Sequence, residues 1–169
     1  MHIAVIVGNP KPFSKTYTIS LRLAEAIAEY AEDASLHVTY DVIDLAPHGG
    51  SFLSWGDPAA AELNERITGA QAVVFASPTY KATYTGLLKL FADQLPPDAL
   101  AGKLAIPLLV GAAPHHSLAV ELHLRPLLVE LGASCPTKGL YVIDSQLDDF
   151  GTIAKEWVSQ NDKWLLNRV

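Results

Sequence analysis

The segment from Gly8 to Thr16 contains the side chains best suited to bind a phosphate group. Ser14 and Thr16 provide hydroxyl donors, and Lys11 and Lys15 add positive charge. The segment follows an apolar strand-like run and opens a helix-like run, so its backbone N–H groups and the helix dipole would converge on one point. Ser14 could instead only cap the helix. The place at the end of a strand favours phosphate, and hydrolysis of a nucleoside triphosphate is disfavoured because no Gly-Lys-Ser/Thr ends the segment.

Two further segments repeat this order of apolar strand, tight turn and helix. One extends from Ser77 to Gly86, and the other extends from Gly111 to Ser117. The carboxyl ends of parallel strands meet at one edge of a sheet, so the three loops are predicted to form one site. Backbone N–H groups of residues 79–81 and 111–113 would point at an electron-poor ring or an anion bound there.

Strand-like and helix-like runs alternate along the chain and predict the elements that position these loops. Strands are predicted at residues 3–7, 36–42, 72–76, 104–110 and 140–143, and helices at residues 16–30, 59–67, 87–95, 118–131 and 152–166. The strand at 36–42 alternates apolar and polar residues, which predicts an edge strand covered on one face. The last helix has Ile153, Trp157, Trp164 and Leu165 as its apolar members.

Five strands separated by helices predict an α/β fold with right-handed crossovers. We expect a flavodoxin-like three-layer α/β/α sandwich with a five-stranded parallel sheet of order 2-1-3-4-5. A six-stranded dinucleotide-binding fold is disfavoured because the first turn is not G-x-G-x-x-G. Residues 1–169 are predicted to form a single domain, since 169 residues suit one core and no linker is visible.

Composition limits the partners and the compartment. The net charge of −6, with no Lys/Arg cluster, argues against nucleic acid and anionic membranes. Cys135 is the single cysteine, which excludes an intrachain disulfide and fits a reducing cytoplasm. The chain enters a strand at Met1 to Val5 without a cationic leader, so no signal peptide is expected. The longest apolar run, at residues 104–113, is too short to span a bilayer.

Several features have a plain structural interpretation beside a functional one. The segment from Ala46 to Pro58 is a crossover loop or a flap carrying Phe52 and Trp55. His115 could line a nicotinamide pocket, but no metal is expected because its side chain diverges from that of His116 and no partner has zinc-like spacing. Lys89 and Asp93, four residues apart, form an ordinary surface pair or face a subunit contact. Cys135 is predicted to be structural.

Taken together, the three loops resemble the NAD(P)H-dependent FMN reductase family over most of the chain. The first loop, with Gly8-Asn9-Pro10-Lys11 and Ser14-Lys15-Thr16, is similar to that family's G-S-x-R…S-x-S phosphate loop. Ser77 to Ala82 with Tyr84 to Lys89 is similar to its S/T-P-x-Y…S-G-x-L-K motif. Gly111 begins the third loop, but residues 112–116 depart from the family's Gly-Gly-Ser/Thr.

The branch that the chain resembles most supplies reduced flavin to two-component sulfonate monooxygenases. In that branch, an aromatic residue or His inserted into the next helix is linked to tetramer contacts and flavin exchange. The equivalent residues here are Leu122 and His123, with no Tyr.

The resemblance implies hydride transfer from NADPH or NADH to FMN, with no catalytic side chain and no metal. It also implies a partner monooxygenase and a homo-oligomer, either a dimer or a tetramer. Two alternatives stay open: a quinone or azo reductase with bound FMN, and a flavodoxin-like electron carrier without NAD(P)H turnover. Tyr80 either lies near the ring or only closes its turn, and Lys81 either meets the ligand or is solvated. The candidate cofactor-binding residues are Asn9, Lys11, Ser14, Lys15, Thr16, Pro78, Thr79, Tyr80, Lys81, Gly111, Ala112 and His115.

Overall fold

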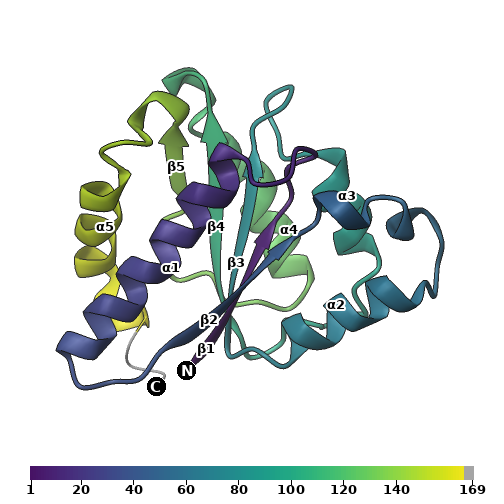
Figure 1. Cartoon of the computed structure of the whole chain (residues 1–169), viewed down its shortest axis with the longest axis horizontal. Helices are drawn as coiled ribbons and strands as arrows, with labels where there is room; N and C mark the ends of the chain where they lie inside the picture. Colours follow the sequence, from purple (N-terminus) through teal and green to yellow (C-terminus); the bar gives the residue numbers. More distant parts are fainter. Residues whose placement is uncertain (166–169) are drawn as a thin grey trace.

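Five parallel strands form one sheet in the order β2-β1-β3-β4-β5 in the computed structural model, which describes residues 1–165 (Figure 1). This confirms the predicted flavodoxin-like topology. The strands are β1 (His2–Val7), β2 (Thr39–Asp44), β3 (Ala72–Pro78), β4 (Leu104–Gly111) and β5 (Leu140–Ile143). The helices are α1 (Lys15–Asp33), α2 (Pro58–Thr68), α3 (Gly86–Asp93), α4 (Arg125–Glu130) and α5 (Phe150–Leu165).

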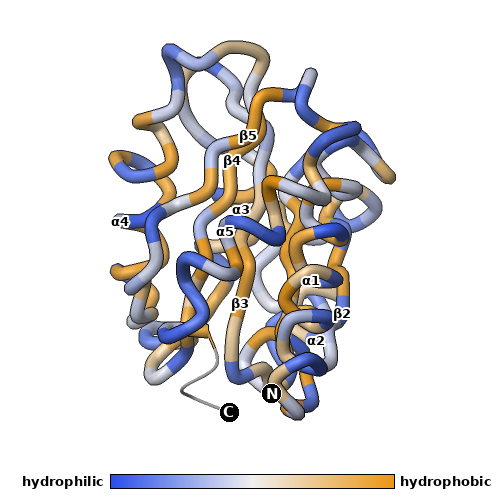
Figure 2. Tube along the Cα trace, turned by 90° about the vertical axis from the view of Figure 1, so that its left-hand side faces the viewer, coloured by the Kyte–Doolittle hydropathy of each residue, from blue (hydrophilic) through white to orange (hydrophobic). Residues whose placement is uncertain are grey.

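Two hydrophobic layers, one on each face of the sheet, hold the sandwich together. Helices α1 and α5 pack on one face, where Leu23 and Trp157 are buried. Helices α2, α3 and α4 pack on the other face, where Phe91 and Leu128 are buried. In Figure 2 the helices alternate between hydrophobic and hydrophilic residues, as expected when each helix has one side against the sheet. The strands β3 and β4 are buried along their whole length, which is typical of central parallel strands.

The edge strand differs from its prediction in extent and burial. Strand β2 begins at Thr39, where its N–H bonds to the Met1 carbonyl, and it is paired with β1 in register through Asp44. Tyr40 is exposed, whereas Val42 packs against one hydrophobic layer and Ile43 lies in the other. The prediction that one face is covered was therefore wrong, because pairing with β1 sets the register and helices cover both faces at the carboxyl end.

The helix predicted at residues 118–131 begins with a π-helical turn over Val120–Leu124 and continues as α4. The N–H of Arg125 bonds to the Val120 carbonyl, five residues back. Pro126 cannot donate a backbone hydrogen bond, and its ring would clash with the carbonyl of Leu122 in a regular α-helix. The wider turn before Pro126 accommodates that ring.

Two surface segments, residues 46–58 and helix α5, differ in part from their predictions. Phe52 is buried and packs against Phe91 with ring centroids 5.1 Å apart, so the segment from Ala46 to Pro58 is anchored rather than a flap that carries Phe52. Trp55 is exposed. In α5, Trp157 and Leu165 are buried as predicted, but Trp164 is exposed, and residue 166 lies outside the described part of the chain. Within residues 1–165, no helix is long and apolar enough to cross a membrane.

Candidate functional site

A pocket of about 550 Å³ opens at the carboxyl ends of β1, β3 and β4, where the three predicted loops meet. Its volume is in the range of pockets that bind cofactors and other small molecules. All of the predicted site residues line it except Lys81 and His115. The lining residues are Asn9, Lys11, Phe13, Ser14, Lys15, Thr16, Thr18, Pro78, Thr79, Tyr80, Val110, Gly111, Ala112 and Asp144.

The first loop, residues 8–16, is held together mainly by its own side chains. Ser14 caps α1, since the Tyr17 N–H donates to Ser14 Oγ at 3.3 Å. Asn9 Nδ2 donates to Thr16 Oγ1 at 3.1 Å, and Asn9 Oδ1 accepts from the Lys11 N–H at 2.9 Å. The capping role proposed for Ser14 is therefore confirmed, and the cap also directs the first turn of α1 at the pocket.

Several donors of the first loop are left for a ligand. The backbone N–H groups of Lys15 and Thr16 make no hydrogen bond to a described residue, as is usual in the first turn of a helix. The hydroxyls of Ser14 and Thr16 accept hydrogen bonds within the loop, and those bonds do not use the hydroxyl protons. Lys15 Nζ lies 3.4 Å from Asp144 Oδ2, and both side chains are exposed. The loop thus offers donors and positive charge to an anion.

The second loop, residues 77–86, is tied to the first through Thr85, which is buried. Thr85 caps α3, because its Oγ1 accepts from the Leu88 N–H at 3.1 Å. The same hydroxyl donates to the Gly8 carbonyl at 2.5 Å, and the Thr85 N–H donates to Ser77 Oγ at 2.9 Å. These bonds join the carboxyl ends of β1 and β3 into one rim.

The tip of the second loop is a tight hairpin turn from Tyr80 to Thr83. The Tyr80 N–H donates to the Thr83 carbonyl at 2.8 Å, and the Thr83 N–H donates back at 3.2 Å. Both central residues have positive φ, 51° at Lys81 and 64° at Ala82. This is the pattern of a type I′ turn, which favours Asn-Gly and strains other residues. The turn leaves Lys81 exposed and away from the pocket, while Tyr80 lines it.

The backbone donors of the second and third loops agree with the prediction only in part. The N–H groups of Thr79 and Tyr80 are bonded to the carbonyls of Val110 and Thr83, so the prediction that they point at a ligand was wrong. In the third loop, residues 111–117, the N–H groups of Ala112 and Ala113 make no hydrogen bond to a described residue. Thr79 Oγ1 is buried and makes no hydrogen bond of ordinary geometry there. The N–H groups of Ala112 and Ala113 were among the predicted donors, whereas the Thr79 hydroxyl was not predicted as one.

His115 lies on the exposed side of the third loop rather than in the pocket. It belongs to a short 3₁₀ turn at Pro114–His116, and its ring lies 4.0 Å from that of His116, centroid to centroid. Among residues 1–165, no three His, Cys, Asp or Glu side chains lie together as a metal site would need. His115 does not line the described pocket, and its role beside a nicotinamide stays a prediction.

Sequence reasoning missed four lining residues: Phe13, Thr18, Val110 and Asp144. Asp144 could have been found, because it directly follows β5 and so lies at the same sheet edge. Phe13 has a positive φ of 49°, and its N–H is held by Asp44 Oδ2 at 3.1 Å. This strained backbone leaves the Phe13 ring exposed at the pocket, a position that no local pattern indicates.

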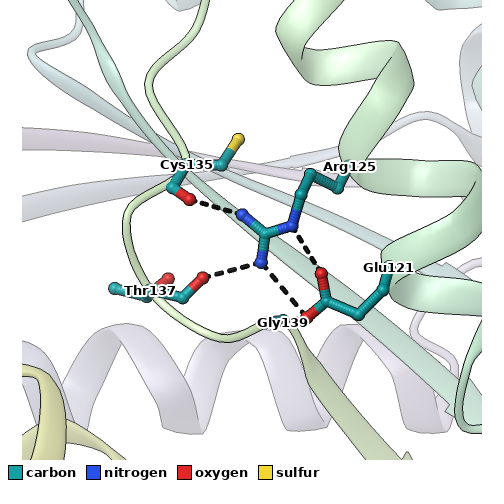
Figure 3. A network of polar contacts seen from close by, with 5 residues as sticks. All are labelled: Glu121, Arg125, Cys135, Thr137 and Gly139. Carbon is teal, nitrogen blue, oxygen red and sulfur yellow. Dashed lines mark hydrogen bonds and ion pairs between the residues drawn. The ribbon is translucent and has the colours of Figure 1, made fainter.

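A polar network of residues that do not line the pocket holds the chain that leads into β5 (Figure 3). Arg125 pairs with Glu121 and donates to the carbonyls of Cys135 and Thr137. Glu121 Oε1 also accepts from the Gly139 N–H at 2.7 Å. The hydrogen bond from Arg125 lowers the pKa of Glu121, and burial raises the pKa of the Cys135 thiol. The network uses the Cys135 backbone carbonyl and not its thiol, and the structural role of Cys135 stays a prediction.

The chain is similar to FMN reductases in both sequence and structure. Residues 1–148 match the family model of the NADPH-dependent FMN reductases. The chain is 30% identical to the FMN reductase (NADPH) of Escherichia coli over 155 residues, which are 89% of this chain and 77% of that protein. It is 30% identical to the NADH-dependent FMN reductase SfnE of Pseudomonas putida, over 88% of this chain and 79% of that protein. The crystal structure of an NADH:FMN oxidoreductase (EMOB) in its apo form is similar, with 28% identity, a TM-score of 0.81, and coverage of 94% of this chain and 87% of that one.

Proposed function

The chain belongs to the NADPH-dependent FMN reductase family, and on that premise we propose that the pocket at the carboxyl edge of the sheet binds FMN for reduction by NADH or NADPH. The flavin and the nicotinamide supply the hydride chemistry themselves, so the protein has to bind, orient and exclude water. No side chain needs to act as an acid, a base or a nucleophile. One observation supports the pocket most strongly: its two ends offer different unsatisfied donors that suit the two ends of FMN.

The first loop would hold the phosphate. The Lys15 and Thr16 N–H groups lie in the first turn of α1, and the hydroxyl protons of Ser14 and Thr16 are available beside them. Helix N-termini favour anions through their dipole and their unpaired N–H groups. Lys11 and Lys15 line the same end of the pocket and add charge that neutralises a phosphate.

The second and third loops would hold the flavin ring. The Thr79 hydroxyl is buried beside the Tyr141 phenol without a hydrogen bond of good geometry, so a ligand that accepts its proton would satisfy it better. The unbonded N–H groups of Ala112 and Ala113 are the backbone donors on the third loop. Donors that are already in place stabilise the charge that reduction adds to the ring. Tyr80, half exposed in the pocket wall, would contact the ring from the second loop.

Titration with FMN and steady-state oxidation of NADH and NADPH test this function. Oxidation that depends on added FMN supports a reductase that uses FMN as its substrate. FMN that stays bound through gel filtration, with fast turnover only when a quinone or an azo dye is added, would support the alternative reductases. Tight FMN without any NADH or NADPH oxidation would indicate an electron carrier and contradict the proposal. The ratio of kcat/KM for the two nicotinamides gives the preference between them.

Delivery of reduced flavin to a partner monooxygenase is the further part of the proposal. It is supported by the resemblance of the loops to reductases of two-component systems. We expect the reductase to raise the product yield of a flavin-dependent monooxygenase when NAD(P)H and FMN are present. A yield no greater than that obtained with chemically reduced FMN at the same concentration would contradict a direct transfer between the two proteins.

A homo-oligomer and a cytoplasmic location also belong to this proposal. Leu118, Leu122 and Val129 are exposed apolar residues on the segment that contains the π-helical turn and α4, and their spacing places them on one side. The low cysteine content supports the compartment. Light scattering after gel filtration should give a dimer or a tetramer, and Leu122→Glu should shift it toward monomer. A monomeric wild-type protein would contradict the oligomer.

A further inference from the structure

Tyr141 reaches from β5 into the wall behind the pocket. It is paired in register with Leu109 on β4, and its side chain extends toward the carboxyl edge over Gly111. A Cβ atom on Gly111 would lie only 2.0 Å from Tyr141 Oη and 2.8 Å from Cζ. The absence of a side chain at Gly111 therefore creates the space that the phenol occupies. Tyr141 is not among the residues that line the pocket.

The phenol holds the third loop by one hydrogen bond. Tyr141 Oη donates to the Ala113 carbonyl at 2.7 Å. Ala113 is extended, with φ −152° and ψ 151°, and it precedes the 3₁₀ turn that begins at Pro114. Because the hydrogen bond fixes the Ala113–Pro114 peptide, it also limits how the neighbouring N–H groups of Ala112 and Ala113 can turn. These are the backbone donors of the third loop that have no partner among the described residues.

The same phenol also lies beside the second loop. Burial raises the pKa of Tyr141 above its ordinary value, and the nearby Thr79 hydroxyl opposes that change. The phenol stays protonated at neutral pH and keeps its donor for Ala113. Thr79 is bonded in turn to β4, through its N–H and the Val110 carbonyl at 2.6 Å. One side chain thus lies between the loop that carries the Thr79 hydroxyl and the loop that carries the free N–H groups.

We propose that Tyr141 is a positioning residue for the flavin ring, acting through Ala113 to hold the donors of the third loop in register with the Thr79 hydroxyl. This assignment rests on the proposed function and deepens it. The hydrogen bond of the Tyr141 hydroxyl reaches the third loop and not the first loop, which forms the phosphate end of the pocket. Loss of the Tyr141 hydroxyl should therefore weaken contacts to the flavin ring alone, and it should raise the Kd of FMN and of riboflavin by the same factor.

The test compares Tyr141→Phe with Tyr30→Phe by flavin fluorescence titration. Tyr141→Phe keeps the ring and removes only the hydroxyl. Tyr30→Phe is the matched control, since the Tyr30 hydroxyl bonds to Asp162 at 3.2 Å between α1 and α5, away from the pocket. One hydrogen bond changes an equilibrium constant about 3- to 10-fold. We expect Tyr141→Phe to raise the Kd of FMN and of riboflavin by the same factor in that range, to raise KM for FMN with kcat unchanged, and the control to change neither.

Three results would overturn the assignment. Tyr141→Phe with wild-type flavin affinity and only a lower melting temperature would show a purely structural role. An affinity loss for FMN without one for riboflavin would place the effect at the phosphate. If Tyr141→Phe does not fold, hydrogen exchange is measured on the wild-type protein instead. Riboflavin should then slow the exchange of the Ala112 and Ala113 amides, and an unchanged exchange rate at both would overturn the assignment. A wild-type protein that binds neither flavin would instead overturn the proposed function, and this assignment with it.

Discussion

The two ends of the pocket are stabilised in different ways. In the first loop the buried side-chain bonds join near neighbours, such as Ser14 with Tyr17 and Asn9 with Thr16, which are three and seven residues apart, and distant partners reach only its exposed side. The ring end, which comprises the second and third loops, depends on distant residues: Thr85 with Gly8 and Tyr141 with Ala113 are 77 and 28 residues apart. The first loop therefore depends more on local bonds than the ring end does. Substitutions should act locally in the first loop and propagate at the ring end.

The largest effect is expected from Gly111→Ala at the ring end. The new Cβ would overlap Tyr141 Oη, so the phenol must move and release Ala113. Overpacking of this kind costs about 1–3 kcal/mol of unfolding free energy. We expect the Kd of FMN to rise more than about tenfold, since both stability and loop position are lost. Gly151→Ala is the control, because nothing lies within 4 Å of its added Cβ. Equal flavin affinity in the two variants would contradict propagation through Tyr141.

Ser14→Ala tests the first loop directly. Loss of the cap on α1 should lower the unfolding free energy by about 1 kcal/mol. Loss of the hydroxyl donor should also raise the Kd of FMN by at least about tenfold while that of riboflavin stays the same, because a bond to a charged group is worth about 1.5–3 kcal/mol. Asp57→Ala removes the cap of α2 and serves as the control for stability alone. Parallel losses for FMN and riboflavin would argue that the loop holds the ring rather than the phosphate.

The turn from Tyr80 to Thr83 gives a smaller effect of opposite sign. Replacing Lys81 and Ala82 by Asn and Gly should relieve the strain of two left-handed residues and raise the unfolding free energy by about 1–2 kcal/mol. Flavin affinity should stay unchanged, because the backbone of the turn is kept and Lys81 lies outside the pocket. Ser35→Gly, at φ 60° after α1, provides the comparison at a remote site. A lower melting temperature of the variant with Lys81→Asn and Ala82→Gly would contradict the claim that these two left-handed residues are strained.

Asp144→Asn should have the smallest effect, at the first-loop end. It frees Lys15 from its ion pair and removes a negative charge from the pocket wall. Exposed pairs are worth less than about 1 kcal/mol, so the KM for FMN should fall about twofold to fivefold and the difference should shrink in high salt. Glu29→Gln breaks the exposed pair with Lys155 and makes the same charge change away from the pocket. An increase in the KM for FMN at low salt would mean that Asp144 itself helps to bind the ligand.

The same contrast explains which predictions succeeded. Ser14, Thr16 and Lys15 were found because a cap and a helix start are encoded within a few residues. Lys81 and His115 were named as candidates because they lie in the second and third loops, but neither lines the pocket, since the path of the backbone within each loop depends on contacts that the sequence does not show. Tyr141 was not recognised because its role depends on the space above Gly111, on a different strand.

The sequence by itself determined the order of strands and helices, the five-stranded topology and the cap of α1 at Ser14. Periodicity, capping and strand ends are properties of residues near each other in the chain, so they can be predicted without contacts. Only the tertiary structure decided which donors of the ring end remain unpaired. The Thr79 and Tyr80 N–H groups are used by Val110 and Thr83, while those of Ala112 and Ala113 are not. That distinction depends on which strands lie side by side, because a hydrogen bond between distant residues exists only after the sheet has formed.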